Sequence, residues 1–273
     1  MPFMNTVSNP LRRTVARYSL TTFFILTYLL SWFSAPFTEG QLLPYGPALA
    51  AVLVLAIGQG RLGLAGLWSQ VKHWRVGWRW YVIAPGIIVT YLLVALVLSL
   101  ALGATIDGSE ALTTTAIASV VIELVFLGGM WEEPGWSGYA LPALQARFDG
   151  RPCGLLKASL VMAGFRALWH MPLVTYGIIT WYDALFVAVA LQLILTWLYN
   201  KTRGSLPVVM LAHLASNVVG GGIMVRLFTG SDQTLYYVVF TAAAFLLGVV
   251  LNSRTGWSMG TRSETSTPVA VTS

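Results

Sequence analysis

Long runs of apolar residues make up most of the chain, and only short polar stretches separate them. A helix needs about 20 residues to cross a hydrocarbon layer of about 30 Å, and eight of the runs approach this length. These runs are 19–36, 43–58, 80–103, 114–130, 155–176, 181–200, 206–225 and 235–251. They lack the alternation of apolar and polar residues found in barrel strands, so helices are the structure expected in lipid. The pattern predicts an all-α, polytopic transmembrane helix bundle with about eight transmembrane helices.

The composition agrees with a location in the membrane. Of the 273 residues, 56% are hydrophobic and 10% are charged, whereas soluble proteins carry about 25% charged residues. This deficit excludes a soluble enzyme, a disordered chain and a nucleic-acid-binding domain. We therefore expect an integral, multi-pass membrane protein, in the plasma membrane if the source is bacterial. We expect it to contact membrane lipid, and we expect no nucleic-acid partner.

The charged residues divide between the two sides of the predicted bundle. Of the 16 Lys and Arg residues, 14 fall at the two termini or in the alternate loops on the same side. The opposite loops are acidic and contain one basic residue, Arg226. Since Lys and Arg mark cytoplasmic loops, both termini are expected in the cytoplasm. We predict a basic cytoplasmic arm over 1–17, a transmembrane domain over 18–252 and a disordered cytoplasmic tail over 253–273.

Several ionisable side chains lie inside the predicted spans, where each costs about 2.5–3.5 kcal/mol on insertion scales. They are Glu123, Glu132, Glu133, Arg166, His170 and His213. To avoid this cost, such groups must face the bundle interior and neutralise one another, or line a wet cavity. Glu123 lies half a helical turn out of phase with Glu132, so we interpret it as a structural residue outside the cluster.

The spacing of the remaining polar groups predicts that they converge. Arg166 and His170 are four residues apart on one predicted helix and therefore share a face. His213 and Asn217 repeat this spacing on another helix. Two helices thus offer a guanidinium, two imidazoles and a carboxamide to a common interior.

The paired carboxylates Glu132 and Glu133 are expected to end a third helix. Pro134 follows them directly, and its missing amide hydrogen should kink or break the helix there. Breaks of this kind occur at membrane depth where the backbone lines a cavity. The sequence therefore predicts a polar cavity beside the two carboxylates.

Three segments resemble the motifs of a known family. The run Glu-Glu-Pro-Gly-Trp-Ser-Gly-Tyr-Ala-Leu-Pro at 132–142 resembles the first motif of the CPBP family of intramembrane proteases (CAAX prenyl protease and bacteriocin-processing, or Abi). Leu-Trp-His-Met-Pro at 168–172 resembles the second motif, and His-Leu-Ala-Ser-Asn at 213–217 the third. The motif core extends over about 80–219. The resemblance implies an intramembrane endopeptidase that hydrolyses a peptide bond of a membrane-associated or lipidated polypeptide.

The resemblance also implies roles for these residues. Glu132 would be the base that activates a water, and His170 would help to hold and polarise that water. His213 and Asn217 would bind the oxyanion that develops on the substrate. Glu133 would be a supporting residue, paired with an arginine as the second glutamate of the motif is in the family.

The chain departs from the family at two positions. Ser137 stands where the first motif normally has arginine, and Arg166 stands where the second motif normally has an apolar residue. On helices that run in opposite directions, both positions lie about one turn closer to the cytoplasm than Glu133 and His170. We therefore hypothesise that Arg166 supplies the missing guanidinium to Glu133. The alternative is an arginine that extends outward to the cytoplasmic surface.

The surroundings of the cluster can also be predicted. Trp136, Tyr139 and Trp169 are expected to pack between helices rather than to contact a substrate. His213 lies seven residues after Leu206, which is about 10 Å along a helix. We therefore expect the polar cavity to open toward the basic, cytoplasmic half of the bundle.

Three alternatives remain open. Glu132, His170 and His213 would be a legitimate ligand set for a catalytic Zn²⁺, but the chain lacks the H-E-x-x-H spacing that favours zinc, so we favour a mechanism without a metal cofactor. A non-catalytic family member, acting as a bacteriocin-immunity factor or membrane scaffold, would explain the missing motif arginine. A proton-coupled transporter would also use buried carboxylates and histidines, although no internal repeat supports it.

Overall fold

The computed structural model describes residues 10–255 and 257–261, and every regular element in this part of the chain is helical. The α-helices are α1 (Pro10–Arg17), α2 (Ser19–Trp32), α3 (Gly46–Gly58), α4 (Arg61–Val71), α5 (Arg79–Ala101), α6 (Thr114–Leu127), α7 (Glu133–Gly135), α8 (Leu141–Arg147), α9 (Gly154–Trp169), α10 (Met171–Thr175), α11 (Ala188–Lys201), α12 (Leu206–Ala215) and α13 (Gly230–Ser253). The short 3₁₀ segments are η1 (Ala35–Phe37), η2 (Ser109–Leu112), η3 (Gly129–Glu132) and η7 (Val225–Leu227). The π-helical segments are η4 (Trp136–Ala140), η5 (Asp183–Val187) and η6 (Ser216–Met224).

The predicted all-α, multi-pass membrane fold is confirmed. Within the described residues, 6 helical segments are long and apolar enough to cross a membrane. They are Ser19–Phe37, Arg79–Ala101, Thr114–Arg147, Asp183–Lys201, Leu206–Leu227 and Gly230–Ser253. The other two predicted spans are occupied by the 13-residue α3 and by the 16-residue α9 with α10. The count of eight spans and the cytoplasmic placement of both termini therefore stay predictions.

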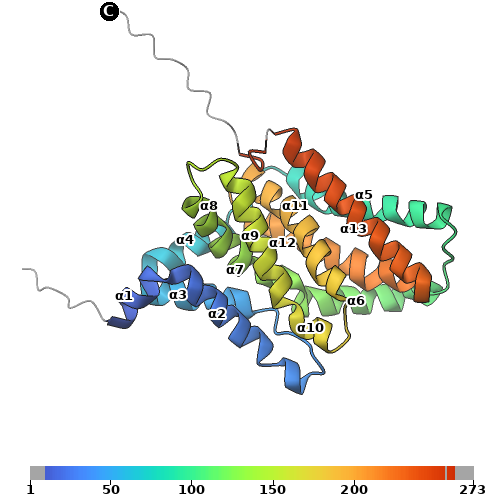
Figure 1. Cartoon of the computed structure of the whole chain (residues 1–273), viewed down its shortest axis with the longest axis horizontal. Coiled ribbons are helices and arrows are strands. Elements are labelled where there is room, and N and C mark those ends of the chain that lie inside the picture. Colours follow the sequence, from blue (N-terminus) through green and yellow to red (C-terminus); the bar gives the residue numbers. More distant parts are fainter. Residues whose placement is uncertain (1–9, 256, 262–273) are drawn as a thin grey trace, which may run out of the picture.

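Helix α11 lies at the centre of the bundle. It packs against α9, α12 and α13, while α5 contacts α12 and α13 from the far side (Figure 1). Helices α2 and α3 pack together on the opposite flank and are tied to α9. The Tyr28 hydroxyl donates to the Phe165 carbonyl at 3.0 Å, and the Trp32 indole donates to the Trp169 carbonyl at 2.9 Å. These bonds hold the N-terminal layer against the helix that carries the second motif.

The helix that leads to the paired carboxylates breaks earlier than the sequence predicts. Helix α6 ends at Leu127, and Gly128 has an extended backbone with ψ of 167°. Helical structure resumes in η3 and α7, so Glu132 and Glu133 begin a new helical segment and do not end the previous one. Pro134 lies in the first turn of α7, where its missing amide hydrogen costs nothing. The proline therefore starts a helix here, and the break lies at Gly128.

The other two motifs also lie at irregular points of their helices. Helix α9 ends at Trp169, and His170 links it to α10, in whose first turn Pro172 lies. Asn217 lies near the start of the wider π-helical η6, which includes Gly220. Insertions of this kind are frequent at functional sites because they turn side chains away from the regular helical positions. All three motifs thus lie where a helix is interrupted.

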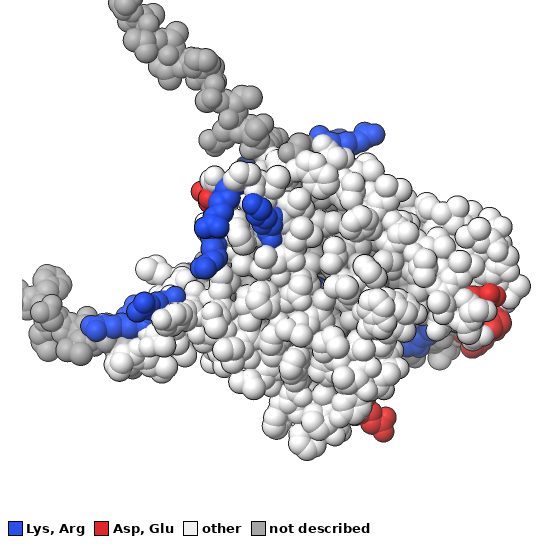
Figure 2. Space-filling view, in the orientation of Figure 1, with Lys and Arg blue, Asp and Glu red and all other residues white. Residues whose placement is uncertain are grey.

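The two ends of the bundle differ in charge. Figure 2 shows most of the visible Lys and Arg side chains over the end with α1 and α8, and most of the visible Asp and Glu side chains toward the opposite side.

The two terminal segments pack against the bundle where they are described. Helix α1 is part of the packed structure, since Val15 is buried. The expected disordered tail also packs where it is described: Met259 is buried, and its carbonyl accepts a 2.8 Å bond from Asn200. Residues 253–255 and 257–261 of the predicted tail are thus described, residues 256 and 262–273 lie outside the described part, and the disordered tail stays a prediction.

Candidate active site

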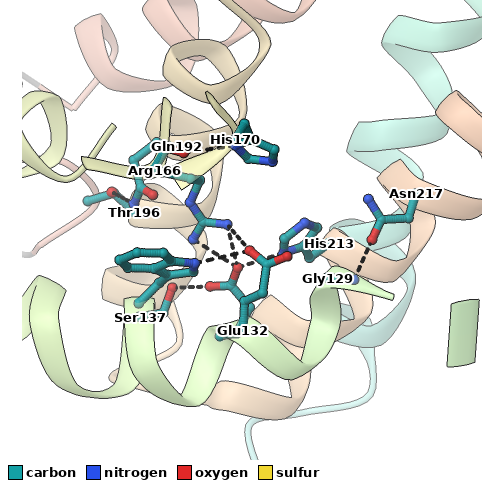
Figure 3. Close-up of polar contacts among 11 residues, drawn as sticks. Gly129, Glu132, Ser137, Arg166, His170, Gln192, Thr196, His213 and Asn217 are labelled. Atoms are coloured by element: carbon teal, nitrogen blue, oxygen red, sulfur yellow. Dashed lines mark hydrogen bonds and ion pairs between the residues drawn. The ribbon is translucent and has the colours of Figure 1, made fainter. Parts of the chain in front are cut away.

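Three separate segments bring the predicted site residues together (Figure 3). The broken segment after α6 carries the two carboxylates, the C-terminal end of α9 carries Arg166 and His170, and α12 with η6 carries His213 and Asn217. Glu132, Glu133, Arg166 and His213 are buried. Buried charges require partners and hydrogen bonds. Their contacts therefore show which groups are held in place and which atoms are left for other partners.

Glu133 is surrounded by hydrogen-bond donors. Its Oε1 accepts from both terminal nitrogens of Arg166, each at 2.9 Å, and lies 2.6 Å from His213 Nδ1. Its Oε2 accepts from the hydroxyl of Ser137. The expected pair of Glu133 and Arg166 is therefore present, and the side chain at position 137 contacts the same carboxylate. With both oxygens engaged, Glu133 is a fixed anion that holds α7, α9 and α12 together.

Glu132 is held through one oxygen only. Its Oε2 accepts from the Trp136 indole at 3.0 Å and lies 3.6 Å from Arg166 Nη1. No described residue donates a hydrogen bond to Oε1. A Cβ atom at Gly129 would lie 2.9 Å from this oxygen and 2.5 Å from His213 Nε2. The free oxygen of Glu132 and the free nitrogen of His213 therefore meet at the same small space beside Gly129.

The two histidines are each oriented through Nδ1. His170 Nδ1 lies 2.8 Å from the carbonyl of Arg166, which can only accept, so Nδ1 carries the proton and Nε2 keeps its lone pair. His213 Nδ1 donates to Glu133 in the same way. The hydrogen bond at one ring nitrogen thus sets what the other can do. Nε2 of His170 is left to accept from a water, and Nε2 of His213 can donate only when the ring is an imidazolium.

Asn217 is positioned by the backbone of the broken segment. Its Oδ1 accepts a 2.8 Å hydrogen bond from the amide of Gly129. Because the carbonyl end of the carboxamide is engaged, its Nδ2 is the donor that remains for another partner. Asn217, His213 and Glu132 all meet Gly129, which makes this glycine the common contact of the site.

The sequence prediction missed two of these contributors. Trp136 was expected to pack between helices; it is fully buried, but it also donates to Glu132 and lies under the Arg166 guanidinium, 5.6 Å from the ring centroid. The four-residue spacing from Glu132 to Trp136 could have revealed this. Gly129 carries no side chain, so only its neighbourhood shows its importance. Glu123 is exposed on α6, and because this helix ends before Glu132, the phase between the two residues does not carry across the break.

A cavity of about 270 Å³ adjoins the cluster. Its lining includes His170, His213 and Asn217 together with residues from η5, α11 and α13. We expected the cavity on the basic half of the bundle, and this expectation is wrong. The lining residues of η5 and η7, including Val187 and Val225, lie on the half that adjoins the acidic loops. The number of residues from Leu206 places His213 closer to the basic end of the bundle. However, η6 continues this helix toward the acidic end, and the cavity extends along η6 in that direction.

The zinc alternative fits this arrangement poorly. Among the described residues, no group of three or more His, Cys, Asp or Glu side chains is arranged to hold a metal ion. The Arg166 cation lies 3.6 Å from the proposed ligand Glu132, where it would repel a metal ion. We therefore derive no step through zinc.

The comparisons with known proteins agree with the motifs. Residues 113–219 match the family described as type II CAAX prenyl endopeptidase Rce1-like. Over 109 residues the chain is 34% identical to CAAX prenyl protease 2 of Methanococcus maripaludis, an alignment that covers 36% of this chain and 38% of the relative. The chain thus spans well under half the length of this relative. No solved structure matches the chain. The segment 113–219, which contains all three motifs, is thus similar to the type II CAAX prenyl endopeptidases.

Proposed function

We propose that the chain is an intramembrane endopeptidase of the CAAX type that hydrolyses a peptide bond of a membrane-associated polypeptide. The observation that carries this proposal is the convergence of a carboxylate with a free oxygen, two oriented imidazoles and a carboxamide with a free amide group, of which the imidazoles and the carboxamide line one cavity. These are the parts that peptide hydrolysis requires, namely a base for water and donors for the oxyanion.

In the proposed reaction, Glu132 is the general base. A water held by Oε1 of Glu132 and Nε2 of His170 attacks the carbonyl carbon of the substrate and gives its proton to Glu132. The carbonyl oxygen becomes an oxyanion that accepts from Nδ2 of Asn217 and from Nε2 of His213. When the tetrahedral intermediate collapses, the carbon–nitrogen bond breaks and Glu132 passes the proton to the leaving amine. The fixed carboxylate of Glu133 balances the imidazolium that this role of His213 requires.

The departure from the first motif does not count against catalysis in this proposal. The guanidinium of Arg166 binds Glu133 from α9, and the Ser137 hydroxyl binds the same carboxylate from its own helix. In the proposed scheme, Arg166 supplies the charge that the motif arginine would otherwise supply. A substrate with a lipid anchor fits the membrane location, and the name of the Methanococcus relative points to the same substrate class.

The test is a cleavage assay in lipid vesicles with lipid-anchored peptides. The wild-type protein is compared with Glu132→Ala and with Glu123→Ala, which removes an exposed carboxylate from the same span as a matched control. We expect Glu132→Ala to abolish cleavage and Glu123→Ala to retain it. Absence of cleavage by the wild type, together with an unchanged phenotype of Glu132→Ala, would favour the scaffold alternative, and equal cleavage by both proteins would show that Glu132 is not the base. Proton-coupled uptake by the same vesicles would favour the transporter.

A further inference from the structure

Asp183 is a buried carboxylate at the end of the cavity where η5 begins. Its side chain is 7% exposed, and it lines the same cavity as His170, His213 and Asn217. The proposed reaction does not use it. A carboxylate that is more than nine-tenths buried in a membrane protein needs an explanation.

One of its two oxygens has a structural role. Oδ2 accepts from the backbone amide of Thr180 at 3.1 Å and from the Thr180 hydroxyl at 2.6 Å. The amide of Asp183 lies 3.3 Å from the same hydroxyl. This reciprocal pattern is a capping box, which satisfies free donors at the start of a helix. The cap accounts for Oδ2 and leaves Oδ1 unexplained.

The other oxygen has no partner. Oδ1 of Asp183 is buried and receives no hydrogen bond from any residue of the described chain. A buried acceptor without a donor is destabilising, and more so when it belongs to a charged group. Such atoms persist where a ligand supplies the missing donor, and this oxygen belongs to a residue of the cavity wall.

The charges around the cavity indicate what that donor is. Arg166 also lines the cavity, but its guanidinium is bound by Glu133 and lies beside Glu132. No ion pair involves Asp183 within 10–255 and 257–261. The cavity therefore contains a carboxylate whose charge is not balanced by the chain. Tyr237 and Phe240 line it as well, and aromatic rings attract cations.

We propose that Asp183 forms a subsite for a cationic group of the substrate, an ammonium or a guanidinium carried by the polypeptide close to the cleaved bond. This deepens the proposed function and rests on it, because the subsite shares one cavity with His170, His213 and Asn217. The cation donates to Oδ1 and balances the carboxylate, while Oδ2 stays in the cap. A polypeptide with a lysine or arginine at the matching position is therefore selected over one with an apolar residue there.

The test uses pairs of lipid-anchored peptides that differ at one position, which is either lysine or norleucine, and this position is moved stepwise along the peptide. Wild-type protein in phosphatidylcholine vesicles should cleave the best lysine peptide roughly tenfold faster than its norleucine partner. Asp183→Asn, which retains an acceptor for the cap, should bring this ratio close to one. A ratio that is the same in the wild type and Asp183→Asn at every position would overturn the subsite.

Two further arms separate the possible failures. Thr180→Ala removes the cap hydroxyl and leaves the carboxylate in place, so it should keep the lysine preference; if it loses the preference as Asp183→Asn does, Asp183 acts only through the cap. Peptide affinity is also measured in a Glu132→Ala background with fluorescent peptides. A tighter binding of the lysine peptide that requires Asp183 supports the subsite even if no peptide is cleaved, in which case the proposed hydrolysis fails alone. Equal affinity for both peptides counts against the subsite.

Discussion

Glu132 and Glu133 are adjacent in the chain, and their surroundings differ in a way that separates structure from chemistry. Both oxygens of Glu133 are occupied, by Arg166, His213 and Ser137. Glu132 is anchored through Oε2 alone and keeps Oε1 free beside Gly129. A buried carboxylate with all its partners holds helices together, whereas one with a free oxygen can take part in a reaction. Asp183 repeats the second pattern at the other end of the cavity.

Replacing Glu132 by glutamine tests the reactive half of this comparison. Glutamine keeps the size of the side chain and an acceptor for the Trp136 indole, but it cannot take a proton from water. We expect the cleavage rate to fall by about 10²–10⁴-fold, the usual contribution of a general base, while the thermal unfolding temperature in detergent changes little. A variant that cleaves at the wild-type rate would show that Glu132 is not the base.

Replacing Glu133 by alanine tests the structural half. The change leaves Arg166 in a buried site with Glu132 as its remaining anion at 3.6 Å, and it removes the partner of His213. Breaking a buried ion pair on one side costs about 3–5 kcal/mol. We expect a loss of this size in the free energy of unfolding, measured by denaturation in mixed micelles. If Glu133→Ala is as stable as Glu132→Gln, the two carboxylates do not differ as proposed.

Replacing Gly129 by alanine tests whether the free Oε1 of Glu132 and the free Nε2 of His213 must lie close together for catalysis. An alanine Cβ would lie 2.5 Å from His213 Nε2 and 2.9 Å from Glu132 Oε1, so at least one of them must move. Removing one donor to an oxyanion slows reactions by about 10²–10³-fold, and we expect Gly129→Ala to lose cleavage to a similar extent. The matched control is Gly164→Ala on α9, where a Cβ would meet nothing within 4 Å. Equal activity of the two variants would contradict the role of this contact.

Some parts of the fold and the site could be predicted from the sequence and others could not. The difference depends on whether a feature is determined by residues close in the sequence or by tertiary packing. The apolar runs and the four-residue spacings depend on neighbouring positions, so they predicted the helices and the shared faces within each helix. The pair of Arg166 with Glu133 was hypothesised from the two departures from the family's motifs. The position of the break was not predictable from Pro134, because a proline both ends helices and starts them, and Gly128 decides between these outcomes through packing. Gly129 became visible only when three helices were placed around it.

The depth and direction of the cavity depend on tertiary packing in the same way. The distance from Leu206 to His213 places the histidine in the part of the span Leu206–Leu227 that is closer to the basic loop, but it does not indicate where the cavity beside the histidine continues. That space is set by how η5, α11 and α13 pack against one another beside η6. Thr180 and Asp183 have the spacing of a capping box in the sequence, so the cap could have been read from it. The free oxygen of Asp183 could not have been predicted from the sequence.

Moving the arginine sharpens the comparison further. Positions 137 and 166 contact opposite oxygens of Glu133, so an arginine at 137 should reach the carboxylate that Arg166→Phe leaves without its cation. We expect Arg166→Phe with Ser137→Arg to be more stable than Arg166→Phe alone by about 1–3 kcal/mol, the size of coupling between residues in contact. Thermal unfolding of the single and double variants provides the measurement. A double variant that is no more stable than Arg166→Phe would show that the two positions do not exchange this role.

The smallest effect is expected from removing metal ions. If the free Oε1 of Glu132 acts as a base for water, incubation with a chelator and dialysis should leave the cleavage rate unchanged, because no step of the proposed reaction uses a metal. The purified protein should then contain far less than one zinc per chain by elemental analysis. Loss of activity in chelator that added Zn²⁺ restores would instead make Glu132 a ligand. In that case the free oxygen of Glu132 would bind the metal rather than a proton. Glu132 would then differ from Glu133 as a metal ligand differs from a structural residue.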